Sequence, residues 1–154
     1  MDSIDDTHRT RGLARTGALA TLAAMVATAL VAALARAAGV DFEVPAGGEP
    51  IPVSGVAVVT GFFSGIGVAV AAVLLRWSPR PAERFVRTAV PLTAISLVPP
   101  LLSGASTGTI AALIGLHLVA AAVVVPALAR QLRTGAAGAG RSRRTETAER
   151  VTQC

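Results

Sequence analysis

The chain has 154 residues, of which 53% are hydrophobic and only 15% are charged, with a net charge of +5 at pH 7. A soluble domain of this size usually has about 25% charged residues, and four long apolar stretches leave no room for a soluble domain with its own core. The charge would suit a nucleic-acid-binding protein, but all 14 basic residues are Arg and they flank the apolar stretches. Membrane topology explains this charge better, so we expect no nucleic-acid partner.

A helix needs about 20 residues to cross a hydrocarbon core about 30 Å thick. The four apolar stretches are Thr16–Leu34, Val53–Leu75, Thr88–Leu102 and Thr109–Ala129. They predict an all-α fold, a polytopic membrane four-helix bundle with helices over about 13–37, 53–76, 85–103 and 108–131. We expect one membrane domain, 12–133, between a disordered N-terminal segment, 1–11, and a flexible tail, 134–154.

The first apolar stretch has a second interpretation. A basic start, an apolar run and Ala35-Arg36-Ala37 could form a signal peptide with its cleavage site. The run of about 19 residues exceeds the usual 7–15 of a signal peptide, so we favour a retained transmembrane helix. At its end, Arg36 can snorkel to the membrane interface or pair with Asp41 or Glu43.

The loop over residues 39–52 contains three prolines, which forbid a regular helix. We expect its apolar residues to cap the bundle or to lie against the membrane face. Alternating apolar and acidic residues over Val40–Val44 permit a short extended piece.

The second helix contains Gly61 and Gly65, a pair of small residues one turn apart that lets another helix approach closely. We predict a packing contact inside the bundle, with a contact in a homo-oligomer as the alternative. Trp77, the only tryptophan, lies where an interfacial aromatic anchor is expected.

The third stretch is interrupted by Pro91, Pro99 and Pro100. Each proline removes a helical hydrogen bond, and the last two free the carbonyls of Ile95 and Ser96. We therefore expect the third helix to kink or unwind near its end.

The arginines indicate the orientation. They occur before the first span, between the second and third spans and after the fourth, whereas the loop over 39–52 has acidic residues and no Arg, and the loop over 103–108 has no charge. Only Arg36 departs from this alternation. By the positive-inside rule, both termini are predicted to be cytoplasmic, and the protein to be a multi-pass protein of a bacterial cytoplasmic (plasma) membrane.

His117 is the only ionisable residue deep inside a span, and such residues are costly enough to suggest function. Counting about 1.5 Å per residue from the loops places four polar side chains at one depth, with Thr93 deeper. These four are Thr28, Thr60, Ser96 and His117. A layer of this kind could bind a small polar or lipid ligand or relay a proton; alternatively, the hydroxyls bond their own helices and His117 fixes helix packing.

Other site types find little support. No Asp or Glu lies within a span, and two His and one Cys offer too few ligands for a metal or haem site, so we expect no cofactor and no metal. His8 is far from His117 in the sequence. The sequence contains no acid–base pair and no nucleophile placed with a base, so we do not expect an enzyme.

The run Val40-Asp-Phe-Glu-Val-Pro45, the segment Ser96-Leu-Val-Pro-Pro100 and Leu116-His117-Leu-Val-Ala-Ala before Arg130 resemble a known group. They are similar to actinobacterial four-helix integral membrane proteins defined only as a domain of unknown function, over about residues 12–133. The resemblance implies four transmembrane helices and no particular activity. The function we expect is that of a non-enzymatic structural or accessory membrane protein, with the lipid bilayer as partner; the alternative is a small transporter or ligand-binding protein using the polar layer.

Overall fold

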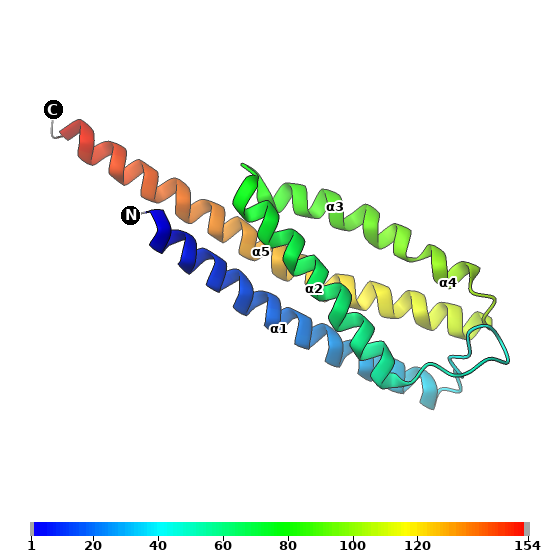
Figure 1. The fold of residues 1–154 in the computed structure, drawn as a ribbon. Helices are drawn as coiled ribbons and strands as arrows, with labels where there is room; N and C mark the ends of the chain where they lie inside the picture. The colour runs from blue at the N-terminus through cyan, green and yellow to red at the C-terminus, as the bar shows by residue number, and fades with distance from the viewer. Residues whose placement is uncertain (1, 153–154) are drawn as a thin grey trace.

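The computed structural model is a bundle of long helices (Figure 1). The helices are α1 Asp2–Ala37, α2 Val53–Trp77, α3 Pro81–Ser96, α4 Val98–Leu102 and α5 Thr107–Thr152. The structure describes the backbone of residues 2–152 and the side chains of residues 10–138. Within residues 2–152 there is no strand, only an isolated antiparallel bridge between Glu43 and Pro50. The all-α prediction is confirmed. Since α1 begins at Asp2 and α5 ends at Thr152, the described backbone of the segments 1–11 and 134–154 is helical, and their flexibility stays a prediction.

Each of four spans is long and apolar enough to cross a membrane: Thr10–Ala37, Val53–Trp77, Pro81–Leu102 and Thr107–Gly138. Even the span of 22 residues is about 33 Å long at 1.5 Å per residue. Only 11–22% of the most apolar part of each span is buried inside the protein. The remaining apolar side chains need a nonaqueous surrounding, so the chain is a multi-pass membrane protein.

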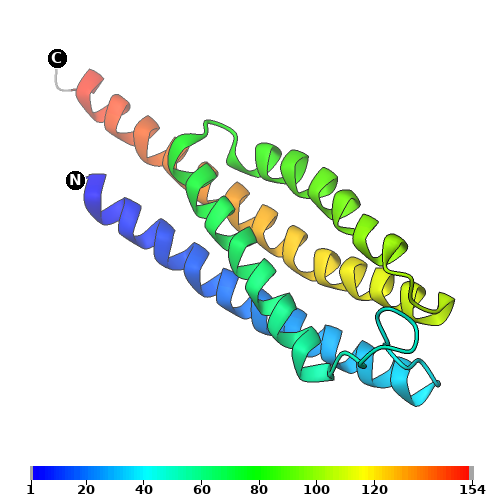
Figure 2. The same ribbon diagram turned by 45° about the vertical axis from the view of Figure 1, so that its right-hand side comes forward.

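The helix α5 contacts each of the other helices, α1, α2, α3 and α4, while α1 and α3 do not touch one another within the described residues. Both ribbon views show α2 running obliquely, from the side of α1 at its start to the side of α3 at its end (Figures 1 and 2). The α1–α2 loop and the α4–α5 connection therefore meet at one end of the bundle. The α2–α3 turn lies at the opposite end.

The core consists of two apolar clusters. We name the clusters after the two ends of the bundle: the arginine end, at the α2–α3 turn, and the loop end, at the α1–α2 loop. The arginine-end cluster takes residues from all four spans; it comprises Leu13, Ala24, Ala71, Phe85, Val124, Leu128, Ala129 and Leu132. The loop-end cluster comprises Ala32, Phe42 and Leu116. A buried stripe of mostly small residues at three- and four-residue spacing runs along α1 from Leu13 to Ala32. Small side chains allow α1 to lie close to both α2 and α5.

The third span is broken where the prolines predict. α3 ends at Ser96, Leu97 leaves the helical bonding pattern, and α4 begins at Val98. The span begins at Pro81, earlier than the expected residue 85, because proline suits the first turn of a helix, where the missing N–H has no partner. The charged Glu83, Arg84 and Arg87 therefore lie in the first part of α3.

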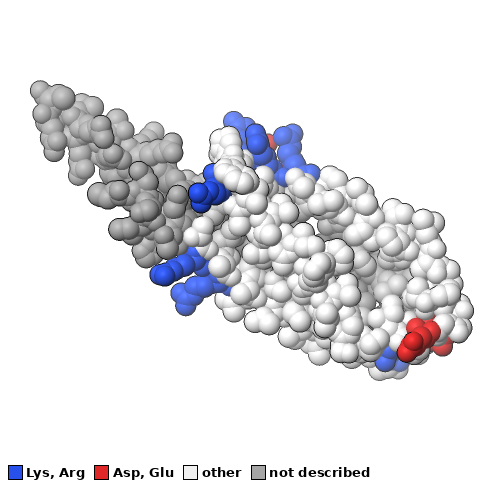
Figure 3. Space-filling model, in the orientation of Figure 1, with Lys and Arg blue, Asp and Glu red and all other residues white. Residues whose placement is uncertain are grey.

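Charge separates along the bundle (Figure 3). The described arginines at the end formed by the α2–α3 turn are Arg11, Arg15, Arg76, Arg80, Arg84, Arg87, Arg130 and Arg133. The loop end carries Asp41, Glu43 and Glu49, together with Arg36.

Candidate functional site

The polar layer counted from the sequence is only partly assembled. The hydroxyl oxygens of Thr28 on α1 and Thr60 on α2 lie 3.2 Å apart. Thr28 is fully buried and also donates to the carbonyl of Ala24, at 2.8 Å. On α1, Thr28 lies one turn from Ala24 of the arginine-end cluster and one turn from Ala32 of the loop-end cluster. The hydrogen bond between Thr28 and Thr60 therefore lies between the two apolar clusters.

The hydroxyls of the third span bond their own helix. Thr93 Oγ1 donates to the carbonyl of Ala89 at 2.9 Å, and Ser96 Oγ donates to the carbonyl of Thr93 at 2.7 Å. Both side chains are half-buried. The Leu97 N–H bonds the carbonyl of Ala94 and not that of Thr93, so Ser96 supplies a donor to a carbonyl that the break at Leu97 leaves without its helical partner.

His117 also bonds its own helix. Its Nδ1 lies 2.8 Å from the carbonyl oxygen of Leu113, one turn earlier in α5. A carbonyl only accepts, so Nδ1 carries the proton and Nε2 is the remaining ring nitrogen. The ring is half-buried beside the buried Leu116. Among the described residues, no hydrogen bond joins His117 to Ser96, Thr60 or Thr28.

The two glycines selected from the sequence have different surroundings. A Cβ atom at Gly61 would lie 2.9 Å from Met25 Sδ on α1, whereas a Cβ at Gly65 would meet nothing within 4 Å. The closest glycine contact with α2 comes from α1: a Cβ at Gly17 would lie 2.8 Å from both γ-methyl groups of Val68. The small-residue spacing along α1 could have indicated this contact, but α1 is alanine-rich on several faces, so the spacing did not stand out.

The sequence did not reveal a hydrogen-bonded clamp at the loop end. Ser106 Oγ donates to Thr109 Oγ1 at 3.1 Å, and Thr109 Oγ1 donates to Asp41 Oδ1 at 2.8 Å. The Thr109 hydroxyl, followed by the backbone N–H of Glu43, lowers the pKa of the exposed Asp41 carboxyl below its ordinary value. The clamp joins the α1–α2 loop to the first turn of α5. Because Asp41 and Thr109 are 68 residues apart in the sequence, no local pattern could have predicted the clamp.

Phe42 is the hydrophobic part of this loop end. Its side chain is 1% exposed, and its backbone has φ 58°, a conformation that is strained for a bulky residue. Arg36 lies over its ring, 5.8 Å from the centroid, and donates to the carbonyl of Ile51. The loop therefore caps the bundle, one of the two expected arrangements, and Arg36 holds the loop through a ring and a carbonyl.

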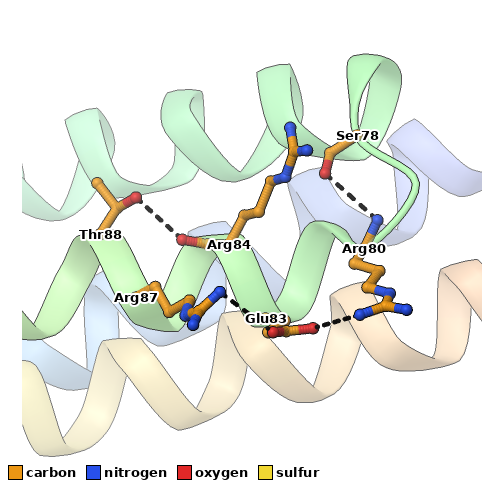
Figure 4. Close-up of polar contacts among 6 residues, drawn as sticks. All are labelled: Ser78, Arg80, Glu83, Arg84, Arg87 and Thr88. Carbon is orange, nitrogen blue, oxygen red and sulfur yellow. Dashed lines mark hydrogen bonds and ion pairs between the residues drawn. The ribbon is translucent and has the colours of Figure 1, made fainter.

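The arginine end carries a row of charges at the start of α3, formed by Arg80, which precedes the helix, and by Glu83 and Arg87 (Figure 4). Glu83 lies between Arg80, at 3.6 Å, and Arg87, at 3.4 Å, while Arg84 points away from this row. An open cleft of about 510 Å³ lies here, between the start of α3 and α5. Its polar lining residues are Arg80, Glu83 and Arg133.

No group of three or more His, Cys, Asp or Glu side chains that could hold a metal ion occurs among the described residues. His8 and Cys154 lie outside the described side chains. The prediction of no cofactor stays a prediction.

The model of a family of unknown function, DUF6069, matches residues 8–134, close to the 12–133 expected from the resemblance. Neither the curated proteins nor the solved structures provide a match. Since the matched region covers most of the 154 residues, the chain belongs to this family of unknown function.

Proposed function

We propose that this protein is a non-enzymatic structural or accessory protein of a bacterial cytoplasmic membrane. The supporting observation is the hydrogen bonding of the polar layer. Ser96, Thr93 and His117 each bond a carbonyl of their own helix, and Thr28 bonds Ala24 while contacting Thr60. An unsatisfied polar group in lipid costs several kcal/mol, so these bonds suit a packing role. A substrate-binding layer would instead present polar groups toward a shared space.

The proposed orientation has both termini in the cytoplasm. The concentration of Arg at one end of the bundle supports it, because cytoplasmic segments carry an excess of Arg and Lys. The exposed Trp77, near this end, suits the membrane interface. The proposed partners are the lipid bilayer and a second copy of the chain. Nucleic acid is not a proposed partner.

A cysteine-labelling experiment tests the orientation. In a Cys154→Ser background, Glu49→Cys and Ser78→Cys place single thiols in the α1–α2 loop and the α2–α3 turn. A membrane-impermeant maleimide added to intact cells is expected to label Glu49→Cys and to leave Ser78→Cys unlabelled until the cells are lysed. The reverse pattern would reject the orientation.

A proton-flux assay tests the role of His117. Proteoliposomes containing the full chain are expected to keep an imposed pH gradient as long as empty liposomes do, and His117→Ala is expected to leave this unchanged. A fast collapse of the gradient that disappears in His117→Ala would show a proton relay and would overturn the structural proposal. Thermal unfolding of both proteins in detergent establishes that the variant is folded.

A further inference from the structure

The cleft at the arginine end differs in chemistry from the rest of the membrane-spanning surface. Its lining combines the charged Arg80, Glu83 and Arg133 with apolar residues such as Pro79, Val86 and Ala136. We propose that this cleft binds the headgroup phosphate of an anionic phospholipid. The proposal is independent of the structural or accessory role, because that role requires no particular lipid.

The charge balance of the cleft favours an anion. Arg133 has no ion-pair partner among the described residues, and the Arg80 side chain is 79% exposed and shares its carboxylate with Arg87. The two separations, 3.6 and 3.4 Å, are too long for strong hydrogen bonds, and exposed ion pairs contribute little. Both guanidinium groups of the cleft can therefore turn toward a phosphate, which guanidinium binds with paired N–H donors.

The apolar side of the cleft fits the rest of a lipid. Val86 lines the cleft, and Val90, one turn further along the same face of α3, is 59% exposed to the membrane. The headgroup would lie beside the arginines and the acyl chain beside these valines. A free phosphate ion would use only the arginines, so the apolar wall argues for a lipid.

Depth along the bundle agrees with this occupant. Arg80 follows the exposed Trp77 by three residues, and tryptophan marks the headgroup level. The cleft therefore opens at the level where lipid phosphates lie. Arg84, on the same helix but pointing away from the row formed by Arg80, Glu83 and Arg87, has the same charge and does not line the cleft.

Lipid titration of the purified full-length protein, followed by native mass spectrometry, tests the proposal. The probes are dioleoylphosphatidylglycerol and dioleoylphosphatidylcholine, which share their acyl chains. Arg80→Gln and Arg133→Gln are each expected to weaken phosphatidylglycerol binding about fivefold to tenfold. Arg84→Gln is the matched control and should bind as the wild type does. Glu83→Gln removes the carboxylate facing the phosphate and should tighten binding about twofold to fivefold, a gain that misfolding cannot mimic.

Three results would overturn the proposal. Equal losses in Arg84→Gln and Arg133→Gln would show diffuse attraction to a positive surface. Equal binding of both lipids would show that the headgroup charge is not recognised. Displacement of phosphatidylglycerol by a small excess of inorganic phosphate would show an anion site that does not use the acyl chain.

Discussion

Replacing Gly17 by alanine is expected to disturb the contact between α1 and α2. The added Cβ would lie 2.8 Å from both γ-methyl groups of Val68 and 3.4 Å from its Cβ. Ordinary contacts of a Cβ begin near 3.4 Å, so either the helices separate by about 0.6 Å or Val68 leaves its preferred rotamer. Valine has a stiff χ1 angle, and overpacking of this kind costs about 1–3 kcal/mol.

A matched variant separates this cost from the helix propensity of alanine. Alanine is favoured over glycine within a helix by about 0.8–1.0 kcal/mol, and this gain applies equally at Gly65, where a Cβ meets nothing within 4 Å. The difference in unfolding free energy between Gly17→Ala and Gly65→Ala therefore isolates the steric cost. We expect Gly17→Ala to be less stable than Gly65→Ala by about 1–3 kcal/mol.

The assay is unfolding by sodium dodecyl sulfate in mixed micelles, monitored by circular dichroism. Val68→Ala removes the two methyl groups that the new Cβ would meet, so in the double variant Gly17→Ala/Val68→Ala most of the steric cost should disappear. A double-mutant cycle measures this coupling directly. Equal stability of Gly17→Ala and Gly65→Ala, together with a coupling near zero, would refute the close approach of α1 to α2.

Three further predictions concern the loop end and the polar pair. Phe42→Ala should destabilise the protein by about 3–5 kcal/mol, whereas Phe62→Ala, which truncates a side chain 65% exposed to lipid, should cost about 1 kcal/mol or less in the same SDS titration. The pKa of Asp41 is lowered by the Thr109 hydroxyl and then by the backbone of Glu43, so its ionised form stabilises the fold above the ordinary pKa near 4. This contribution is lost as the pH falls through the lower folded-state pKa. The difference in melting temperature between wild type and Asp41→Asn should therefore shrink when thermal scans are taken from pH 7 to pH 3. A difference that stays constant over this range would contradict the clamp. Thr28→Val should lower the free energy of unfolding by about 0.6 kcal/mol, because it removes the hydrogen bond between α1 and α2. A double-mutant cycle with Thr60→Val should show a coupling of that size.

The sequence predicts the spans well because each depends on local composition. A run such as Val53–Leu75 has to be apolar over its whole length to cross the membrane, and the prolines at 99 and 100 break the third helix wherever it packs. Depth counting predicts that Thr28 and Thr60 lie at one level, since helices of known direction place equal counts at equal levels, but their pairing is visible only in the structure. Rotation about each helix axis does not follow from depth, which is why the bonds of Ser96 and His117 could not be predicted.

Rotation is difficult to predict here for a physical reason. In a soluble helix, polar residues mark the exposed face, but lipid is as apolar as the core and marks neither face. In α1, Ala24 is buried and Leu22 is 58% exposed, the opposite of what size and hydrophobicity suggest for a soluble protein. Between Ala20 and Ala32 of α1, small residues face the helix interfaces because they allow close approach, whereas Leu22, Val26 and Leu30 are exposed. Packing contacts such as that of Gly17 with Val68 therefore become visible only when the partner helix is in place.

The distribution of bonded and unbonded polar groups limits where this protein can act. Inside the membrane, the polar side chains of the candidate layer bond their own helix or a neighbouring helix. At the loop end, Asp41 and Arg36 are engaged in holding the loop. At the arginine end, by contrast, Arg133 has no ion-pair partner among the described residues and lines an open cleft. An arginine without an ion-pair partner can bind an anion without first giving up a salt bridge, which is why the lipid proposal places the phosphate at this cleft.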